Sequence, residues 1–91
     1  MISNKAVVQR LVEIFSRKGF DKVVISPGSR NAPLIQTFAG RGEFELYSVP
    51  DERTAGFIAL GIAMKIRRPV ILNCTSGTAL LHYAPAVVEA Y

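Results

Sequence analysis

The sequence predicts an α/β protein in which a parallel sheet lies between two layers of helices. Short runs that are typical of strands occur at residues 23–25, 45–49 and 70–74, and helical patterns lie before, between and after them. A repeated strand-helix-strand order requires right-handed crossovers, which give parallel strands with helices on both faces of the sheet. Three strands are few for such a sheet, so we expect the 91 residues to form an incomplete domain.

The first helix is predicted over residues 4–18, where apolar side chains recur at helical spacing and Gly19 then ends the helix. The run at 23–25 is β-branched and stops at a Ser-Pro-Gly turn at residues 26–28, which is typical of a buried strand that leads into a loop. A second helix is predicted to begin around Pro33.

A third helix is predicted up to residue 66, with Asp51 as its N-cap after a strand at 45–49. It is apolar nearly all round, so we expect a partner subunit or further chain to cover it. The strand at 70–74 precedes a single fourth helix predicted over 78–89. Small residues leave little bulk along part of the third helix, and these are Ala55, Gly56, Ala59, Gly61 and Ala63.

Composition argues against several classes of function. The net charge of +4 is scattered along the chain, and its densest cluster, at 65–68, lies at a predicted helix end, where the helix dipole favours basic residues. There is no basic stripe of the kind that nucleic-acid binding needs. The single Cys74 rules out an internal disulfide, and no stretch resembles a signal peptide or a membrane span. We therefore expect a soluble, cytoplasmic protein with neither nucleic-acid nor membrane partners.

Polar loops follow all three predicted strands, at residues 26–31, 49–54 and 74–78. Ligands of open parallel sheets bind at the carboxyl ends of the strands, so these loops are the candidate site. The hydroxyls and glycine of the third loop are also what any tight strand-to-helix turn prefers. The common phosphate, dinucleotide and zinc motifs are absent from the sequence.

Each candidate residue has a structural interpretation beside a functional one. Arg30 at a helix N-terminus could hold a carboxylate or phosphate; alternatively, Ser29 or Asn31 caps the helix and Arg30 is a surface charge. Glu52 could be present because the helix dipole stabilises it, or it could hydrogen-bond a heterocycle nitrogen in an enclosed site. His82, expected on the fourth helix, has no partner at metal-ligand spacing and is more often structural.

Taken in order, three motifs resemble one family. They are SPGSRNAPL at 26–34, Asp-Glu-Arg at 51–53, and TSGTA at 75–79, which is followed by PAV and EA. The family is the 2-succinyl-5-enolpyruvyl-6-hydroxy-3-cyclohexene-1-carboxylate (SEPHCHC) synthases, thiamin diphosphate enzymes of menaquinone biosynthesis. The resemblance covers essentially the whole chain. It implies that residues 1–91 are the N-terminal part of the pyrimidine-binding domain, with the remaining domains absent.

The resemblance also implies an activity. These synthases decarboxylate 2-oxoglutarate on thiamin diphosphate and add the succinyl carbanion equivalent to isochorismate. Mg²⁺ and the cofactor's phosphates would be held by a domain outside these residues. The full-length protein would be a homodimer or homotetramer, and the 91 residues alone would be inactive.

Individual roles follow from the same resemblance. Glu52 matches the catalytic glutamate that hydrogen-bonds the aminopyrimidine and favours its imino tautomer. Ser29 and Arg30 match contacts to isochorismate, and a guanidinium suits a carboxylate. His82 stands where an asparagine is common in the family, which puts any role for that position in doubt. The positions expected to line the cofactor cavity are Pro27, Thr75, Ser76, Gly77 and Thr78.

Three alternatives stay open from the sequence. Acetolactate synthases and 2-oxo acid decarboxylases share the thiamin diphosphate fold and the glutamate, but would not be expected to carry Ser-Pro-Gly-Ser-Arg after the first strand. A non-catalytic sugar-phosphate-binding module could use the third loop, although it would leave Glu52 unexplained. Finally, the chain could mediate association alone, through the small-residue face of the third helix.

Overall fold

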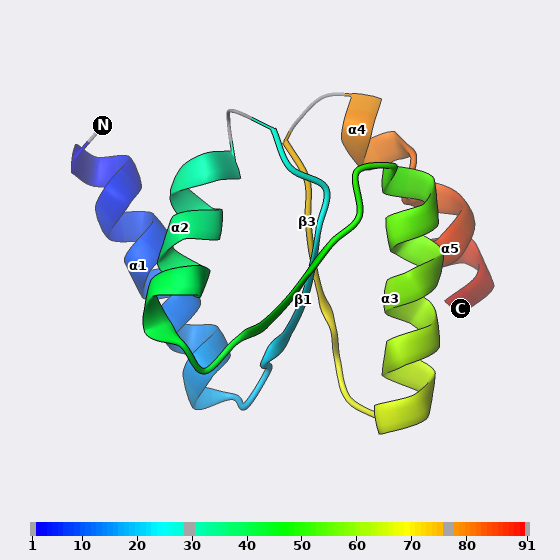
Figure 1. Cartoon of the computed structure of the whole chain (residues 1–91), viewed down its shortest axis with the longest axis horizontal. Coiled ribbons are helices and arrows are strands. Elements are labelled where there is room, and N and C mark those ends of the chain that lie inside the picture. The colour runs from blue at the N-terminus through cyan, green and yellow to red at the C-terminus, as the bar shows by residue number, and fades with distance from the viewer. Residues whose placement is uncertain (1, 29–30, 76–77, 91) are drawn as a thin grey trace.

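A three-stranded parallel sheet lies between two layers of helices, as the sequence predicts (Figure 1). This computed structural model describes residues 2–28, 31–75 and 78–90. In this part of the chain, no helix is both long and apolar enough to cross a membrane. The elements are α1 (Ile2–Arg17), β1 (Lys22–Ile25), α2 (Ala32–Arg41), β2 (Glu45–Ser48), α3 (Glu52–Ile66), β3 (Ile71–Asn73), α4 (Thr78–Leu81) and α5 (Ala84–Ala90).

The sheet has the strand order β2-β1-β3, so β1 lies in the middle and pairs with both neighbours. Val24 of β1 stands opposite Tyr47 of β2 and Leu72 of β3. Figure 1 shows α1 and α2 on one face of the sheet and α3, α4 and α5 on the other. Because a strand between two helical layers is covered on both faces, β1 is made almost entirely of buried β-branched residues.

Each face of β1 contributes to a separate hydrophobic core, because successive side chains of a strand point to opposite faces. Val23 and Ile25 pack in the core under α1 and α2, whereas Val24 packs under α3 and against Tyr83 of the turn before α5. In the first core the rings of Phe38 and Phe44 meet edge to face, with centroids 4.8 Å apart. The second core is built from the small side chains of α3, which bring that helix close to the sheet.

Gly19 ends α1 as predicted, in a left-handed backbone conformation with φ of 74°. Gly42 ends α2 in the same way, with φ of 78°, although no end was predicted for that helix. Asp51 caps α3 as predicted, because its carboxylate accepts a hydrogen bond from the backbone N–H of Thr54 at 2.9 Å. This cap fixes where α3 begins, and therefore where Glu52 lies.

The prediction of one continuous fourth helix is wrong. The chain forms two short helices, α4 and α5, separated by a turn at His82 and Tyr83. Pro85 explains the break, because it has no backbone N–H and its ring would clash with the carbonyl of Leu81 one turn earlier. A proline is tolerated in the first turn of a helix, and that is where Pro85 lies in α5.

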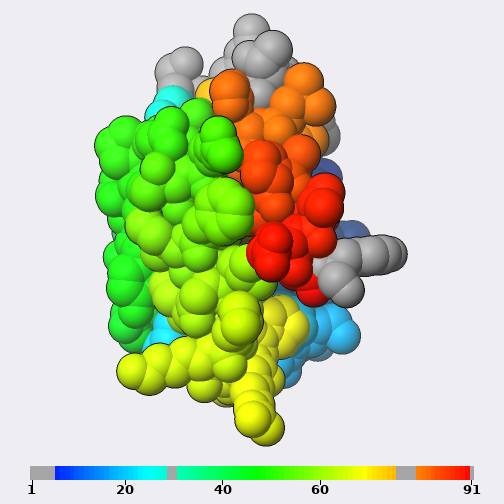
Figure 2. Space-filling view, turned by 90° about the vertical axis from the view of Figure 1, so that its right-hand side faces the viewer, coloured from blue at the N-terminus to red at the C-terminus, as the bar shows by residue number. Residues whose placement is uncertain are grey.

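The small-residue face of α3 is largely covered by the chain itself. Figure 2 shows α3 and α5 packed side by side. A Cβ atom built on Gly56 would lie 3.0 Å from the Cβ of Ala86 in α5, so the missing side chain permits the close approach. Large apolar side chains of α3 remain exposed elsewhere, at Phe57, Ile58 and Met64. A partner that docked on this face, as the association-only alternative requires, would find Gly56 covered by α5 of the same chain.

Candidate functional site

The carboxyl ends of the three strands are joined at Ser26, directly after β1. Its backbone N–H donates to the carbonyl of Asn73 in β3, and its hydroxyl donates to the carbonyl of Val49 after β2, both at 2.8 Å. Ser26 is completely buried. The predicted meeting of the loops at one edge is thus confirmed for the described residues, and Figure 1 shows α2, α3 and α4 starting at this edge.

Asn31 ties the first loop to the third strand. Its side-chain Nδ2 donates to Oδ1 of Asn73 at 2.5 Å and to the carbonyl of Ser26 at 3.2 Å. Its Oδ1 accepts from the backbone N–H of Gly28 at 2.8 Å. Asn31 occupies the N-cap position of α2, but its side chain makes no cap hydrogen bond there. The suggestion that the Asn31 side chain caps this helix is therefore wrong.

The first and third loops touch at Gly28 and Thr75. A Cβ atom built on Gly28 would lie 2.8 Å from the Cβ of Thr75, closer than side-chain carbons can approach. The predicted cofactor-lining residues Pro27 and Thr75 thus lie at the same edge, the first exposed and the second half-buried. Only glycine allows the two loops to come this close.

Glu52 is the first residue of α3 and is half-buried. The adjacent Asp51 accepts hydrogen bonds from the hydroxyl and backbone N–H of Thr54, and these bonds hold the pKa of the Asp51 carboxyl below its usual value. The cap fixes the start of α3. The carboxyl of Glu52 therefore lies at the edge where the strand ends meet. A carboxyl in this position can exchange a hydrogen bond or a proton with a heterocycle nitrogen.

Two candidate residues after β3 lie in α4 or next to it. Thr78 begins α4. His82 is exposed and lies in the turn after α4, so its predicted place within a helix is wrong. Among the described residues, no group of three or more His, Cys, Asp or Glu could hold a metal ion. Four predicted site residues, Ser29, Arg30, Ser76 and Gly77, lie outside the described residues.

Two buried residues near this edge were missed from the sequence. Asn73 ends the apolar run of β3, and a polar residue at the end of a buried strand was a usable signal. Tyr83 is 3% exposed, and burial raises the pKa of its phenol to about 12. Nothing in the local pattern separates Tyr83 from an ordinary helix residue, because its burial depends on the break before Pro85.

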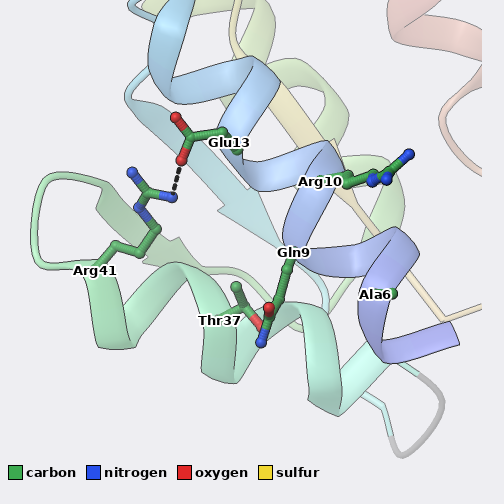
Figure 3. A pocket seen from close by; sticks show the side chains of 6 residues that line it. All are labelled: Ala6, Gln9, Arg10, Glu13, Thr37 and Arg41. Atoms are coloured by element: carbon green, nitrogen blue, oxygen red, sulfur yellow. Dashed lines mark hydrogen bonds and ion pairs between the residues drawn. The ribbon is translucent and has the colours of Figure 1, made fainter. Parts of the chain in front are cut away.

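An open groove lies between α1 and α2, away from the strand ends (Figure 3). Glu13 and Arg41 form an ion pair of 2.7 Å across it, and the Arg41 guanidinium lowers the pKa of Glu13. Arg10 points away from this pair. The groove's facing charges are already paired, so it does not form part of the candidate site.

Residues 5–91 match the family described as "Thiamine pyrophosphate enzyme, N-terminal TPP binding domain". The chain belongs to the thiamine pyrophosphate enzymes. This membership agrees with the α/β fold and with a glutamate at the edge of the sheet. The half-buried carboxyl of Glu52 at that edge is compatible with a heterocyclic cofactor there.

Among the thiamine pyrophosphate enzymes, three similar proteins carry one name, 2-succinyl-5-enolpyruvyl-6-hydroxy-3-cyclohexene-1-carboxylate synthase. The Porphyromonas gingivalis protein is 54% identical over 89 residues, 98% of this chain and 15% of that protein. The Bacteroides fragilis protein is 50% identical over 91 residues, which are 100% of this chain and 16% of that protein. The Flavobacterium johnsoniae protein is 54% identical over 86 residues, which are 94% of this chain and 16% of that protein. The resemblance to SEPHCHC synthases is confirmed, over about a sixth of their length.

Proposed function

We propose that residues 1–91 are the N-terminal part of the pyrimidine-binding domain of a SEPHCHC synthase. The complete enzyme would decarboxylate 2-oxoglutarate with thiamin diphosphate and transfer the succinyl group to isochorismate, in menaquinone biosynthesis. It would work in the cytoplasm as a homodimer or homotetramer, with Mg²⁺ held outside these residues. The observation that carries the proposal is Glu52, fixed by the Asp51 cap at the edge where the strand ends meet.

Glu52 would act on the aminopyrimidine of the cofactor. Thiamin diphosphate, when bound, supplies the carbanion chemistry, and the protein supplies position and proton control. A carboxyl at the start of α3 can donate to a ring nitrogen and favour the imino tautomer. The hydrogen bonds that Asp51 accepts from Thr54 hold the first turn of α3. They therefore fix the backbone position of Glu52, the next residue in the chain. The small-residue surface of α3 keeps that helix pressed against the sheet while it does so.

The loops beside Glu52 would bind the rest of the ligands. Pro27, together with residues 75–78, would line the cofactor cavity, because the contact between Gly28 and Thr75 brings the first and third loops together. Ser29 and Arg30 would contact isochorismate. A guanidinium can form two parallel hydrogen bonds to a carboxylate, which favours Arg30 as the residue that orients this substrate.

A second candidate is another thiamin diphosphate enzyme, such as an acetolactate synthase or a 2-oxo acid decarboxylase. The family match is compatible with this alternative. The Ser-Pro-Gly-Ser-Arg loop and the 50–54% identity to proteins named as SEPHCHC synthases favour the SEPHCHC synthase proposal. A non-catalytic phosphate-binding module is a weaker candidate, because it gives Glu52 no task.

The test is an omission assay on the full-length protein. Isochorismate consumption is followed with 2-oxoglutarate, thiamin diphosphate and Mg²⁺ all present, and again with each left out in turn. We expect consumption only when all are present, and none with residues 1–91 alone. Consumption of a different 2-oxo acid without isochorismate would assign the protein to another thiamin enzyme. Activity without the cofactor would contradict the proposal.

A further inference from the structure

The hydrogen-bond ladder between β1 and β2 is interrupted at Pro27. Ile25 is the last residue of β1, and its carbonyl accepts from the backbone N–H of Val49 at 2.8 Å. In a parallel pair with this register, every second residue of β1 bonds to β2, so the next donor would be the N–H of residue 27. Its acceptor would be the Val49 carbonyl. Proline has no N–H, so the ladder leaves this carbonyl without its backbone donor.

The hydroxyl of Ser26 takes the place of the missing N–H. It donates to the Val49 carbonyl at 2.8 Å, a normal length for a bond between a hydroxyl and a carbonyl. Ser26 is completely buried, and its own backbone N–H donates to the carbonyl of Asn73 in β3 at 2.8 Å. The serine that donates this bond is thus held by the sheet itself, and an alanine at position 26 would remove the bond and little else.

Only Pro50 and Asp51 lie between the held carbonyl and Glu52, and both are restricted. The ring of Pro50 fixes its φ at about −65° and limits the conformations of Val49 before it. Asp51 accepts from the hydroxyl and the backbone N–H of Thr54, at 2.6 and 2.9 Å. The bond from Ser26 therefore holds one end of a stiff segment, and Glu52 lies at the other end.

We propose that Ser26 is a positioning residue for Glu52, because its hydroxyl holds the Val49 carbonyl and thereby fixes the segment that carries the glutamate to the end of β1. This inference rests on the role of Glu52 in the proposed function. The rival is a purely structural role, in which the hydroxyl satisfies a carbonyl and stabilises the fold without affecting turnover. The two differ in what Ser26→Ala does to kcat at a temperature at which the variant is folded.

The experiment compares Ser26→Ala with Thr37→Val in the full-length protein. Thr37 is the matched control, because its hydroxyl also donates to a backbone carbonyl at 2.8 Å, that of Pro33, beside the groove of Figure 3 and away from the strand ends. The readouts are kcat and the KM for each substrate, well below the thermal midpoints. We expect Ser26→Ala to lower kcat by roughly 10- to 100-fold, the effect of a misplaced catalytic group, with little change in either KM. Thr37→Val should change none of them.

Amide hydrogen exchange tests the same bond without turnover. The reporters are the backbone N–H groups of Val49 and Ala55, which donate to the carbonyls of Ile25 and Asp51 at 2.8 and 2.9 Å. If Ser26 holds the segment between them, Ser26→Ala should speed their exchange on the order of 10-fold, which is what the loss of one hydrogen bond allows. Thr37→Val should leave both rates as in the wild type.

Ser26→Cys keeps the volume of the side chain but replaces the hydroxyl with a weak donor, so it carries the test should Ser26→Ala not fold. Wild-type kcat in the folded variant, whatever its exchange rates, would overturn the inference and leave the structural role. A lower kcat without faster exchange at Val49 and Ala55 would overturn it too, because the segment would not have been released. A wild-type protein that neither binds thiamin diphosphate nor turns over would instead refute the proposed function.

Discussion

The side-chain amides of Asn31 and Asn73 meet in the buried floor of the candidate site, with Nδ2 of Asn31 2.5 Å from Oδ1 of Asn73. The two residues come from the start of α2 and the end of β3. A buried amide pair of this kind is stabilising only when its other donors and acceptors are also satisfied. Asn31 meets that condition by bonding to Ser26 and Gly28 as well.

Asn31→Ala should destabilise the fold. The Gly28 N–H and the Asn73 Oδ1 would both lose a partner, at about 1–3 kcal/mol for each unsatisfied buried group. Urea unfolding measures the loss. In a cycle with Asn73→Ala, the two changes should couple by about 0.5–3 kcal/mol, as residues in one network do. Additive losses would mean that the pair does not act as a unit.

Gly28→Ala should also be destabilising, because the new Cβ would lie 2.8 Å from the Cβ of Thr75. Overpacking of this kind costs about 1–3 kcal/mol. Gly40→Ala in α2 is the matched control, since nothing lies within 4 Å of its added Cβ. That change should leave the stability equal or raise it by up to about 1 kcal/mol. Equal thermal midpoints for the two variants would contradict the close contact between the loops.

Glu52→Gln in the full-length protein should abolish turnover and leave the fold intact. An amide cannot exchange the proton, and losing acid–base catalysis costs at least about 100-fold in rate. Glu45→Gln is the control, because Glu45 pairs with Lys22 at 2.6 Å at the start of β2, away from the candidate site. Circular dichroism should match wild type for both variants. Near-normal activity of Glu52→Gln would remove its proposed role.

Arg30→Ala should raise the KM for isochorismate far more than the KM for 2-oxoglutarate. Loss of a charge-assisted hydrogen bond is worth about 1.5–3 kcal/mol, which is on the order of 10- to 100-fold in KM. Arg10→Ala is a matched loss of one positive charge in the α1–α2 groove of Figure 3. It should change neither constant. Equal increases for both substrates in Arg30→Ala would refute the assigned contact.

The phenol of Tyr83 should ionise at an unusually high pH. Because its folded pKa of about 12 exceeds the usual value, the neutral form stabilises the fold. This contribution is complete below about pH 10 and is lost as the pH rises through the folded pKa, at about 1.4 kcal/mol per pH unit. Absorbance at the phenolate band measures the titration. The late phase should vanish in Tyr83→Phe and persist in Tyr47→Phe; a persistent late phase in Tyr83→Phe would contradict the assignment.

Local patterns predicted most of the fold. The β-branched run of β1 and the Asp51 cap are each decided by residues near one another in the chain, and both lie where expected. The break in the last helix was also decided locally, by Pro85, and the apolar pattern around it concealed the signal. The candidate site residues Glu52 and Thr75 could be named from motifs, and the parallel strands bring their loops to one edge.

What the sequence could not supply is the pairing of polar groups that are distant along the chain. Asparagine is a common N-cap residue, so the sequence suggested that Asn31 caps α2. Its side chain instead hydrogen-bonds to Asn73, which lies 42 positions later in the chain. The burial of Tyr83 similarly requires both the helix break and the small residues of α3. Such contacts depend on tertiary packing, which local propensity does not contain.

The central place of β1 in the sheet has a consequence for how the site can vary. Through Ser26, the strand sets the starting point of the first loop and of its two neighbours. A slip of one residue in β1 would turn Val24 into the opposite helical layer and displace all three loops together. The spacing between the three loops therefore depends on one strand of four residues, and the loops can differ in sequence while that spacing stays constant.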